Sequence, residues 1–230
     1  MSPHALSSPL NGRLRATDWS ARRRARLVAA ALRAGRSSAN DAFDRFLPQE
    51  LREVSAQYWT PRPTVRRAAA WLREAQVRTV VDIGSGAGKF CVATALLTRC
   101  RFTGVEQRAS LVSAARGLAG IFNVDDRVRF VHANCGASTT PAGDAYYLFN
   151  PFGPYYFGSA RFDDPSVVFT QETYQADVAA VTALLSRAPL GTFVITCNGF
   201  GGQVPPSYEQ IDVDLGLRGT LRLWKKQGLG

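Results

Sequence analysis

The sequence predicts an α/β fold, in which a mainly parallel sheet carries helices on both faces. Short apolar segments with strand character alternate along the chain with longer segments whose apolar residues recur at helical spacing. One strand-like segment, residues 80–83, leads into three glycines spaced two residues apart, and the next, residues 101–106, ends in an acid. Two such strands joined by a helix form a right-handed parallel unit, which is the building block of this fold class.

The length and composition set the expected domain organisation. With 230 residues, of which 46% are hydrophobic, the chain can bury one sizeable core. We expect one α/β domain over residues 58–230, preceded by a basic, mainly helical extension over residues 1–57. The sequence has no run of about 18 apolar residues and does not begin with the apolar stretch of a secretory signal. A soluble, cytoplasmic protein without a membrane partner is therefore expected.

The cysteines and histidines do not suggest a metal site. Four cysteines and two histidines are scattered without the spacing of zinc ligands or of a Cys/His nucleophile. No metal is expected, and the four cysteines are expected to be buried thiols in a reducing compartment.

The basic residues are concentrated in the extension. Residues 1–80 hold 15 arginines, no lysine and 6 acids, a balance of +9, whereas residues 81–230 balance at +1. Residues 1–12 are rich in Ser and Pro and are expected to be disordered. Residues 13–36 hold eight arginines and one acid among alanines and leucines, which favours a helix. Such an arm would attract nucleic acid or an acidic protein; the alternatives are a solvated helix face and an organelle-targeting peptide.

A proline-containing segment precedes the glycines. Two prolines hold residues 58–63 extended, and a helix is predicted over residues 64–75. The extended segment can fold as a lid over a ligand on the glycine loop, through Tyr58, Thr60 and Pro61. The alternative is ordinary packing between helices.

The glycine loop is the first stretch that points to chemistry. Glycine adopts backbone angles closed to other residues and lets the main chain approach a ligand closely. The dinucleotide fingerprint G-x-G-x-x-G fails here, because its third glycine would fall at Lys89. The order from Asp82 to Gly88, acid-x-Gly-x-Gly-x-Gly, instead resembles the first motif of the class I (seven-strand) S-adenosylmethionine-dependent methyltransferases.

This resemblance implies a seven-strand Rossmann-like methyltransferase sheet, with S-adenosyl-L-methionine as the cofactor. It implies that Gly84, Ser85, Gly86 and Gly88 pass under the methionine part of the cofactor. Asp82 would meet the cofactor's amino group, directly or through water. A helix predicted over residues 89–98 would point its free N–H groups at the bound ligand.

Two further strands add residues to the implied cofactor site. Glu106 ends the second strand, where a carboxylate can accept hydrogen bonds from both ribose hydroxyls; a solvated charge is the alternative. The third strand ends at Asn134, where the superfamily often carries an Asp that holds the adenine amino group, and an Asn oxygen can do the same. The alternative role of Asn134 is to form a turn. Gln107 and Cys135, the next residues along the chain, are assigned to cofactor binding with them.

The strand over residues 145–150 leads into a candidate acceptor site. Asn150-Pro151-Phe152 is similar to the Asn-Pro-Pro-Tyr loop of methyltransferases acting on planar or amide nitrogens, with one proline missing. It also resembles the Asn-x-Phe part of the corresponding loop in seven-strand histone-lysine methyltransferases. The resemblance implies that these three residues are catalytic, with Tyr155 and Tyr156 beside the substrate. The alternative is an aromatic turn that packs beside the sheet.

The rest of the chain completes the pattern with one departure. A helix is predicted over residues 170–187, followed by a fifth strand and a closing antiparallel pair, over residues 191–198, 208–215 and 220–226. The connection over residues 199–207 is too short and too rich in Gly and Pro for the helix usually found there. The resemblance covers residues 58–226.

The resemblance predicts methyl transfer to a nitrogen, with a protein lysine as the acceptor. In-line displacement at a sulfonium needs alignment more than acid–base groups. In seven-strand lysine methyltransferases a Tyr-x-Pro-Thr-like segment lies at the place of Tyr58, Thr60 and Pro61, which match it loosely. The alternatives are a nucleic-acid base methyltransferase, favoured by the arginine arm, a small-molecule methyltransferase, and a non-catalytic RNA-binding protein on the same fold.

Overall fold

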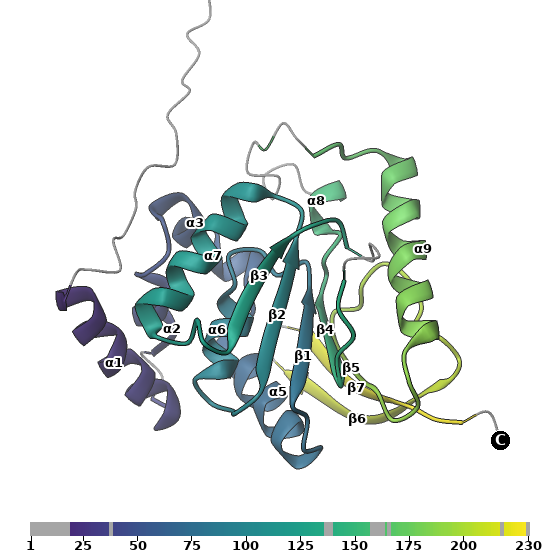
Figure 1. Cartoon of the computed structure of the whole chain (residues 1–230), viewed down its shortest axis with the longest axis horizontal. Helices are drawn as coiled ribbons and strands as arrows, with labels where there is room; N and C mark the ends of the chain where they lie inside the picture. The colour runs from purple at the N-terminus through teal and green to yellow at the C-terminus, as the bar shows by residue number, and fades with distance from the viewer. Residues whose placement is uncertain are drawn as a thin grey trace, which may run out of the picture.

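The described residues form a seven-stranded sheet (Figure 1). The computed structural model describes residues 19–36, 39–135, 140–156, 164, 167–216 and 219–228. The predicted disorder of residues 1–12 and the first two arginines of the arm, Arg13 and Arg15, lie outside these ranges. The strands are β1 (Thr79–Ile83), β2 (Arg101–Glu106), β3 (Val128–His132), β4 (Ala145–Phe149), β5 (Phe193–Cys197), β6 (Tyr208–Gly216) and β7 (Gly219–Lys226).

The strand order defines the fold and the edge that carries the site. The order is β3-β2-β1-β4-β5-β7-β6, with the first five strands parallel and β7 antiparallel to both of its neighbours. The chain moves outward from β1 to β3, then returns to β4 on the other side of β1. Sheets of this kind bind ligands where the order reverses, outside the carboxyl ends of the strands. The predicted seven-strand Rossmann-like sheet is confirmed.

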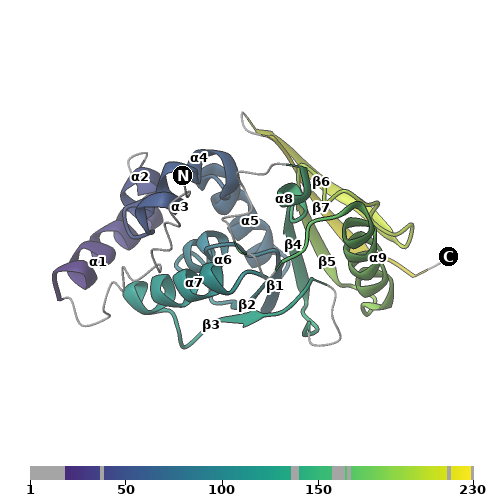
Figure 2. The ribbon, with the colours of Figure 1, turned by 90° about the horizontal axis from the view of Figure 1, so that it is seen from above.

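Helices lie on both faces of the sheet, as predicted (Figure 2). Leu72, Val92 and Leu118, from three different helices, share one buried cluster with Val80 of β1. On the other face, Val181 packs in a second cluster with strand residues of β1, β4 and β5. Among the described residues, none of the helices combines the length and the apolar character that crossing a membrane requires. The helices are α1 (Trp19–Arg33), α2 (Ala39–Asp44), α3 (Gln49–Glu53), α4 (Ser55–Tyr58), α5 (Arg62–Glu74), α6 (Lys89–Ala95), α7 (Ala109–Phe122), α8 (Gly153–Tyr156) and α9 (Gln171–Arg187).

The element boundaries follow the sequence closely, with a few differences. The connection between β5 and β6 contains no helix in the described residues 198–207, as the glycines and prolines predict. Tyr58, predicted to be extended, instead ends the short helix α4. The helix α8, which follows Asn150-Pro151-Phe152, was not predicted, because four residues are too few to show a helical period.

The N-terminal extension shares its core with the α/β domain. On its inner face α1 buries Ala25, Ala29 and Leu32 in the cluster that α5, α6 and α7 form on the sheet. Phe43 stacks on Phe122 of α7, with the ring centroids 4.6 Å apart. The described part of the extension therefore packs as part of the domain that carries the glycine loop.

A buried ion pair fixes the extension to the first residue of α6. Lys89 Nζ lies 2.7 Å from Asp44 Oδ1 and donates to Asp44 Oδ2 at 2.9 Å. The Ser55 hydroxyl donates to the same carboxylate at 2.5 Å and accepts from Lys89 Nζ at 3.1 Å. All three side chains are buried. Because α6 begins directly after the glycine loop, the ion pair also determines where that loop ends.

Substitution Asp44→Ala is expected to destabilise the fold strongly. It would leave the Lys89 ammonium buried without its carboxylate, and breaking a buried pair in this way costs about 3–5 kcal/mol. Urea unfolding monitored by circular dichroism measures the change. The matched control is Asp126→Ala, because the exposed Asp126 lies 3.8 Å from Arg127 and should contribute at most about 0.5 kcal/mol. Equal effects of the two substitutions would contradict the role assigned to the buried pair.

Candidate active site

The glycine loop turns back on the end of β2. Gly84, Gly86 and Gly88 have φ values of +74°, +53° and +78°, which strain any residue with a β-carbon. The N–H groups of Gly84 and Ser85 both donate to the Val105 carbonyl, at 2.9 and 3.0 Å. Gly86 N donates to Glu106 Oε2, and Gly88 N donates to the Ser85 carbonyl, both at 2.9 Å. The loop is therefore held against β2.

Two neighbouring segments approach the loop so closely that only glycine fits. A β-carbon at Gly84 would lie 2.6 Å from Pro151 Cβ, and one at Gly86 would collide with the indole ring of Trp59. Trp59 is itself fixed, since its Nε1 donates to the Leu51 carbonyl at 2.9 Å. The loop after β1 is thus in contact with the candidate acceptor loop on one side and with the segment before α5 on the other.

Asp82 lies beneath the glycine loop. Its side chain is buried and accepts a hydrogen bond from Cys91 Sγ of α6 at 3.2 Å. Burial raises the pKa of Asp82 to about 7; the Cys91 hydrogen bond opposes this shift and the nearby Glu106 charge adds to it. The sequence placed this carboxylate facing the ligand. The structure places it at the same loop but turned toward α6.

Glu106 has a more crowded environment than the sequence predicts. The carboxylate is 1% exposed. It accepts hydrogen bonds from Gly86 N at 2.9 Å and from Arg108 N, Nε and Nη2 at 2.9, 2.7 and 2.9 Å. Burial alone would raise the pKa of Glu106, but the Arg108 charge and these hydrogen bonds outweigh it and lower the pKa below its ordinary value. Glu106 is therefore an ionised carboxylate paired with a guanidinium.

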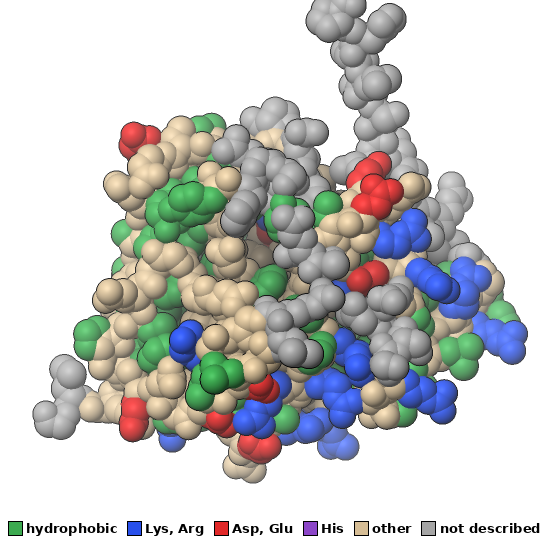
Figure 3. Space-filling view, turned by 180° about the vertical axis from the view of Figure 1, so that it is seen from behind, with side chains coloured by type: hydrophobic (Ala, Val, Ile, Leu, Met, Phe, Trp, Pro, Cys, Tyr) green, Lys and Arg blue, Asp and Glu red, His purple; other side chains and the backbone are tan. Residues whose placement is uncertain are grey.

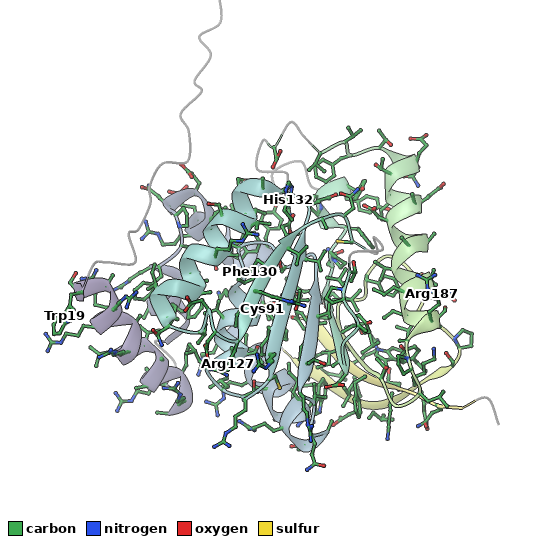
Figure 4. All side chains as sticks on the ribbon, in the orientation of Figure 1. Trp19, Cys91, Arg127, Phe130, His132 and Arg187 are labelled. Atoms are coloured by element: carbon green, nitrogen blue, oxygen red, sulfur yellow. The ribbon has the colours of Figure 1, made fainter. Side chains whose placement is uncertain are left out.

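The other predicted cofactor residues lie along the same edge. Asn134 is exposed just beyond β3. The Gln107 carbonyl accepts a hydrogen bond from His132 Nε2 at 2.9 Å, and Figure 4 shows His132 at this end of the sheet. Cys135 is buried in the apolar cluster beneath α9, so its side chain faces the core.

The four cysteines are all buried, as predicted. Burial is the largest cause that raises the pKa of each thiol. The charge of Asp82 raises the pKa of Cys91 further, and that of Glu106 raises the pKa of Cys135 further. Each thiol is thereby held in its protonated form.

The residues at this edge fit S-adenosylmethionine. Ser85 Oγ is buried, and no hydrogen-bond partner for it exists among the described atoms, so the loop holds a polar group that a ligand can satisfy. Glu106 can accept from ribose hydroxyls, and the exposed Asn134 can accept from the adenine amino group. The glycine backbone suits the amino acid part. Two carboxylates already have partners in the protein: Asp82 accepts from Cys91, and Glu106 accepts from Arg108.

On the acceptor side, β4 ends in a sharp turn at Asn150. Asn150 has φ +41°, a left-handed conformation that Asn tolerates better than most residues. Its carbonyl accepts from Gly153 N at 3.0 Å, and its side chain is exposed. Phe152 is only 2% exposed and belongs to the core cluster beneath α9. Its predicted contact with the acceptor is therefore corrected: the turn directs Asn150 outward and Phe152 into the core.

A group of tyrosines lies on α8 and α9, the two described helices that follow Asn150 in the chain. Tyr155 and Tyr156 of α8 meet Tyr174 of α9 edge-on, with centroids 5.5 and 5.2 Å apart. The Tyr155 hydroxyl donates to Asp177 Oδ2 at 2.6 Å, and burial raises the pKa of Tyr155 to about 12. Tyr156 is 63% exposed. Tyr174 and Asp177 were not predicted as site residues, although their spacing of three residues, which places them on one helix face, was a signal.

The predicted lid is only partly in place. Thr60 is buried, and its hydroxyl is 3.0 Å from the Tyr147 hydroxyl inside the core, which corrects its assignment as a lid residue. Pro61 precedes α5 in an extended conformation, and Tyr58 is half-buried. Trp59, which lies between them, is the residue that covers Gly86. Proline geometry predicted an extended segment but not which side chain would face the loop.

Comparison with known proteins agrees with this fold. No protein-family model and no curated protein matches the sequence. An RNA methyltransferase from Salinibacter ruber, solved with S-adenosyl-L-homocysteine, aligns with a TM-score of 0.53 and 19% identity over 73% of this chain and 93% of that one. A putative caffeoyl-CoA O-methyltransferase from Staphylococcus aureus aligns with a TM-score of 0.56 and 14% identity, over 88% and 99% of the two chains. The ribosomal protein L11 methylase from Lactobacillus delbrueckii subsp. bulgaricus aligns with a TM-score of 0.51 and 11% identity, over 72% and 79%.

These likenesses establish the fold. The chain has the fold of the class I S-adenosylmethionine-dependent methyltransferases, as the glycine loop and the strand order indicate. The three named neighbours are described as acting on an RNA, a caffeoyl-CoA and a ribosomal protein. The fold therefore leaves the acceptor to be argued from this chain's own residues.

The raised pKa of Asp82 predicts that stability falls as the pH rises. The carboxyl ionises near pH 4 in an unfolded chain but near 7 in the folded one, so the folded state binds the extra proton. Between about pH 4 and about pH 7 the free energy of unfolding therefore falls, because the buried Asp82 carboxyl is forced to ionise. Urea unfolding at about pH 5 and about pH 8 should show a drop in stability that is smaller in Asp82→Asn. The same drop in both proteins would contradict the assignment.

Proposed function

We propose that the protein is an S-adenosylmethionine-dependent methyltransferase that acts on a nitrogen atom, with a protein lysine as the acceptor. The observation that carries the proposal is the contact between Gly84 and Pro151. It brings the cofactor loop after β1 and the acceptor loop after β4 together where the strand order reverses. A methyl donor held by one loop and an acceptor held by the other would be neighbours.

The proposed chemistry depends on alignment. When bound, the cofactor supplies a methyl group on a positively charged sulfur. Once a lysine ammonium has released one proton to solvent, the Asn150 side-chain oxygen and the Pro151 carbonyl can accept hydrogen bonds from the neutral amine and so direct its lone pair along one line. Positioning of this kind supplies much of the rate in displacement reactions. Trp59, by covering Gly86, keeps water from that part of the loop.

The surroundings of Asn150 favour a cationic acceptor. Tyr155, Tyr156 and Tyr174 offer ring faces and hydroxyls, and Asp177 adds a carboxylate hydrogen-bonded to Tyr155. Aromatic faces and a carboxylate attract an ammonium group. The exposed Tyr156 can meet an incoming side chain first. Phe152, which the sequence offered for packing against a planar base, is buried, and the Asp177 carboxylate favours an ammonium group over a neutral base.

The direct test uses tritiated S-adenosylmethionine with lysate from the protein's own source. Protein, nucleic acid and small molecules are then separated. Label in a protein band, located on lysine by mass spectrometry, supports the proposal. Label confined to nucleic acid or to small molecules refutes the lysine assignment, and no binding of the cofactor in calorimetry refutes the methyltransferase assignment.

Substitution Asn150→Ala should remove turnover and leave cofactor affinity nearly unchanged. We expect the kcat to fall by about 100-fold, because the acceptor loses the group that orients it. Asn198→Ala is the matched control, since Asn198 directly follows β5 in the same left-handed conformation, with φ +59°, and its side chain accepts from Thr220 N of β7. Single-turnover kinetics and calorimetry with S-adenosylhomocysteine separate the two effects. Equal losses in both variants would mean that turn geometry, and not the Asn150 amide, matters.

A second candidate function, methylation of a nucleic acid, is favoured by the outer face of α1. Arg22, Arg23, Arg24 and Arg26 are exposed there, beside Trp19, which is 78% exposed. Figure 3 shows basic side chains gathered over the part of the surface where α1 and α5 lie, and Figure 4 shows Trp19 at the outer edge of the molecule. Arginines bind phosphates, and an exposed indole can stack on an unpaired base.

If this face binds RNA, removing its charges should weaken the salt dependence of binding. The triple variant Arg22→Gln, Arg23→Gln, Arg26→Gln loses three phosphate contacts. The slope of log affinity against log salt should then become shallower by about 2. The control neutralises Arg187, Arg222 and Lys225, which lie on α9 and β7. Filter binding with single-stranded RNA measures both slopes, and equal slopes would exclude α1 as the binding surface.

A further inference from the structure

The Glu106 carboxylate has no remaining acceptor site. A carboxylate has about four lone-pair sites, two on each oxygen. Oε1 accepts from Arg108 N and Nε, and Oε2 accepts from Gly86 N and Arg108 Nη2. A cofactor ribose that binds Glu106 through its hydroxyls must therefore displace donors that are already in place.

The four donors differ in whether they can leave. Gly86 N and Arg108 N belong to the backbone, which is fixed by the glycine loop and by the start of α7. Nε and Nη2 belong to a side chain and can leave by rotation about its single bonds. Their departure frees one acceptor site on each carboxylate oxygen. A ribose diol offers two hydroxyl donors, one for each vacated site.

The guanidinium is held firmly in its present place. Arg108 is only 5% exposed, and Nε lies 2.7 Å from Glu106 Oε1. Two parallel hydrogen bonds to a carboxylate are the strong, directional pairing of arginine. The charge of Asp164 also favours the Arg108 cation.

We propose that the Arg108 side chain occupies the ribose-diol site of Glu106 and that cofactor binding displaces it. The inference depends on the proposed cofactor. The guanidinium satisfies Glu106 while no ligand is bound, so the site keeps its shape and its charge balance. Part of the cofactor's binding energy is then used to break the pair, and this lowers the net affinity. Only a ligand with two adjacent hydroxyl donors replaces both hydrogen bonds that Arg108 gives up.

Calorimetry with S-adenosylhomocysteine tests the proposal on the full-length chain. Arg108→Met removes the donors and keeps a long, flexible side chain, so the affinity should rise at least about tenfold, which is 1.4 kcal/mol of binding free energy. Arg108→Lys, which cannot form the paired hydrogen bonds, should bind with intermediate affinity. The control is Arg116→Met, a change of the same charge on α7, where Arg116 donates to the Phe130 carbonyl; its affinity should stay at the wild-type value.

Thermal unfolding separates binding from stability. Without ligand, Arg108→Met should unfold at a lower temperature than the wild type, because Glu106 loses its partner. The ligand should raise the unfolding temperature of Arg108→Met by more than it raises that of the wild type. If Arg108→Met does not fold, Arg108→Lys serves as the test variant. Equal or weaker binding by the Arg108 variants, with binding retained in the wild type, would overturn the displacement and leave the cofactor assignment intact. Absence of binding in every protein would overturn both.

Discussion

The packing around the candidate site depends on three glycines in the loop after β1, where a side chain would not fit. Three segments reach the loop after β1 at van der Waals distance: Pro151 at Gly84, Trp59 at Gly86 and Phe130 at Gly88. They come from the acceptor loop, the segment before α5 and β3. Each contact would be lost with a β-carbon, since L side chains also disfavour these positive φ values. The glycines therefore serve the protein's own packing as much as a ligand, and they bring the parts of the candidate site into one place.

The sequence predicts the positions of residues that depend on the alternation of a strand or on a local turn. Glu106 ends an apolar strand, so its place on the edge of the sheet followed from parallel topology, as did the position of Asn150 at the end of β4. The residues that were mispredicted depend on segments distant in the chain. Phe152 is buried because α9 lies over it, and Thr60 points inward because Tyr147, 87 residues away, meets its hydroxyl. The Arg108 pairing is a choice of rotamer, which neither composition nor spacing encodes.

The N-terminal extension combines two roles that its sequence shows only in part. Alanines at every fourth position of α1 allow close packing on the domain, and the arginines between them stay in solvent. The excess of positive charge in the sequence pointed only to the solvent-exposed face of α1. The rest of the extension matters equally for the site, because Asp44 at the end of α2 holds Lys89 directly behind the glycine loop. An extension that resembles an appended arm in sequence therefore contributes to the support of that loop.

The protonated state of the four cysteines has a chemical consequence if the proposed cofactor, an alkylating agent, binds at this site. A thiolate is a strong nucleophile, whereas a thiol is not. Burial is the largest cause that raises the pKa values of Cys91 and Cys135, and the neighbouring acids Asp82 and Glu106 raise them further. Two carboxylates at the proposed cofactor site thus help to keep buried sulfur groups protonated. In a methyltransferase of the kind proposed, burial and these charges together would keep the two cysteines from becoming methylated.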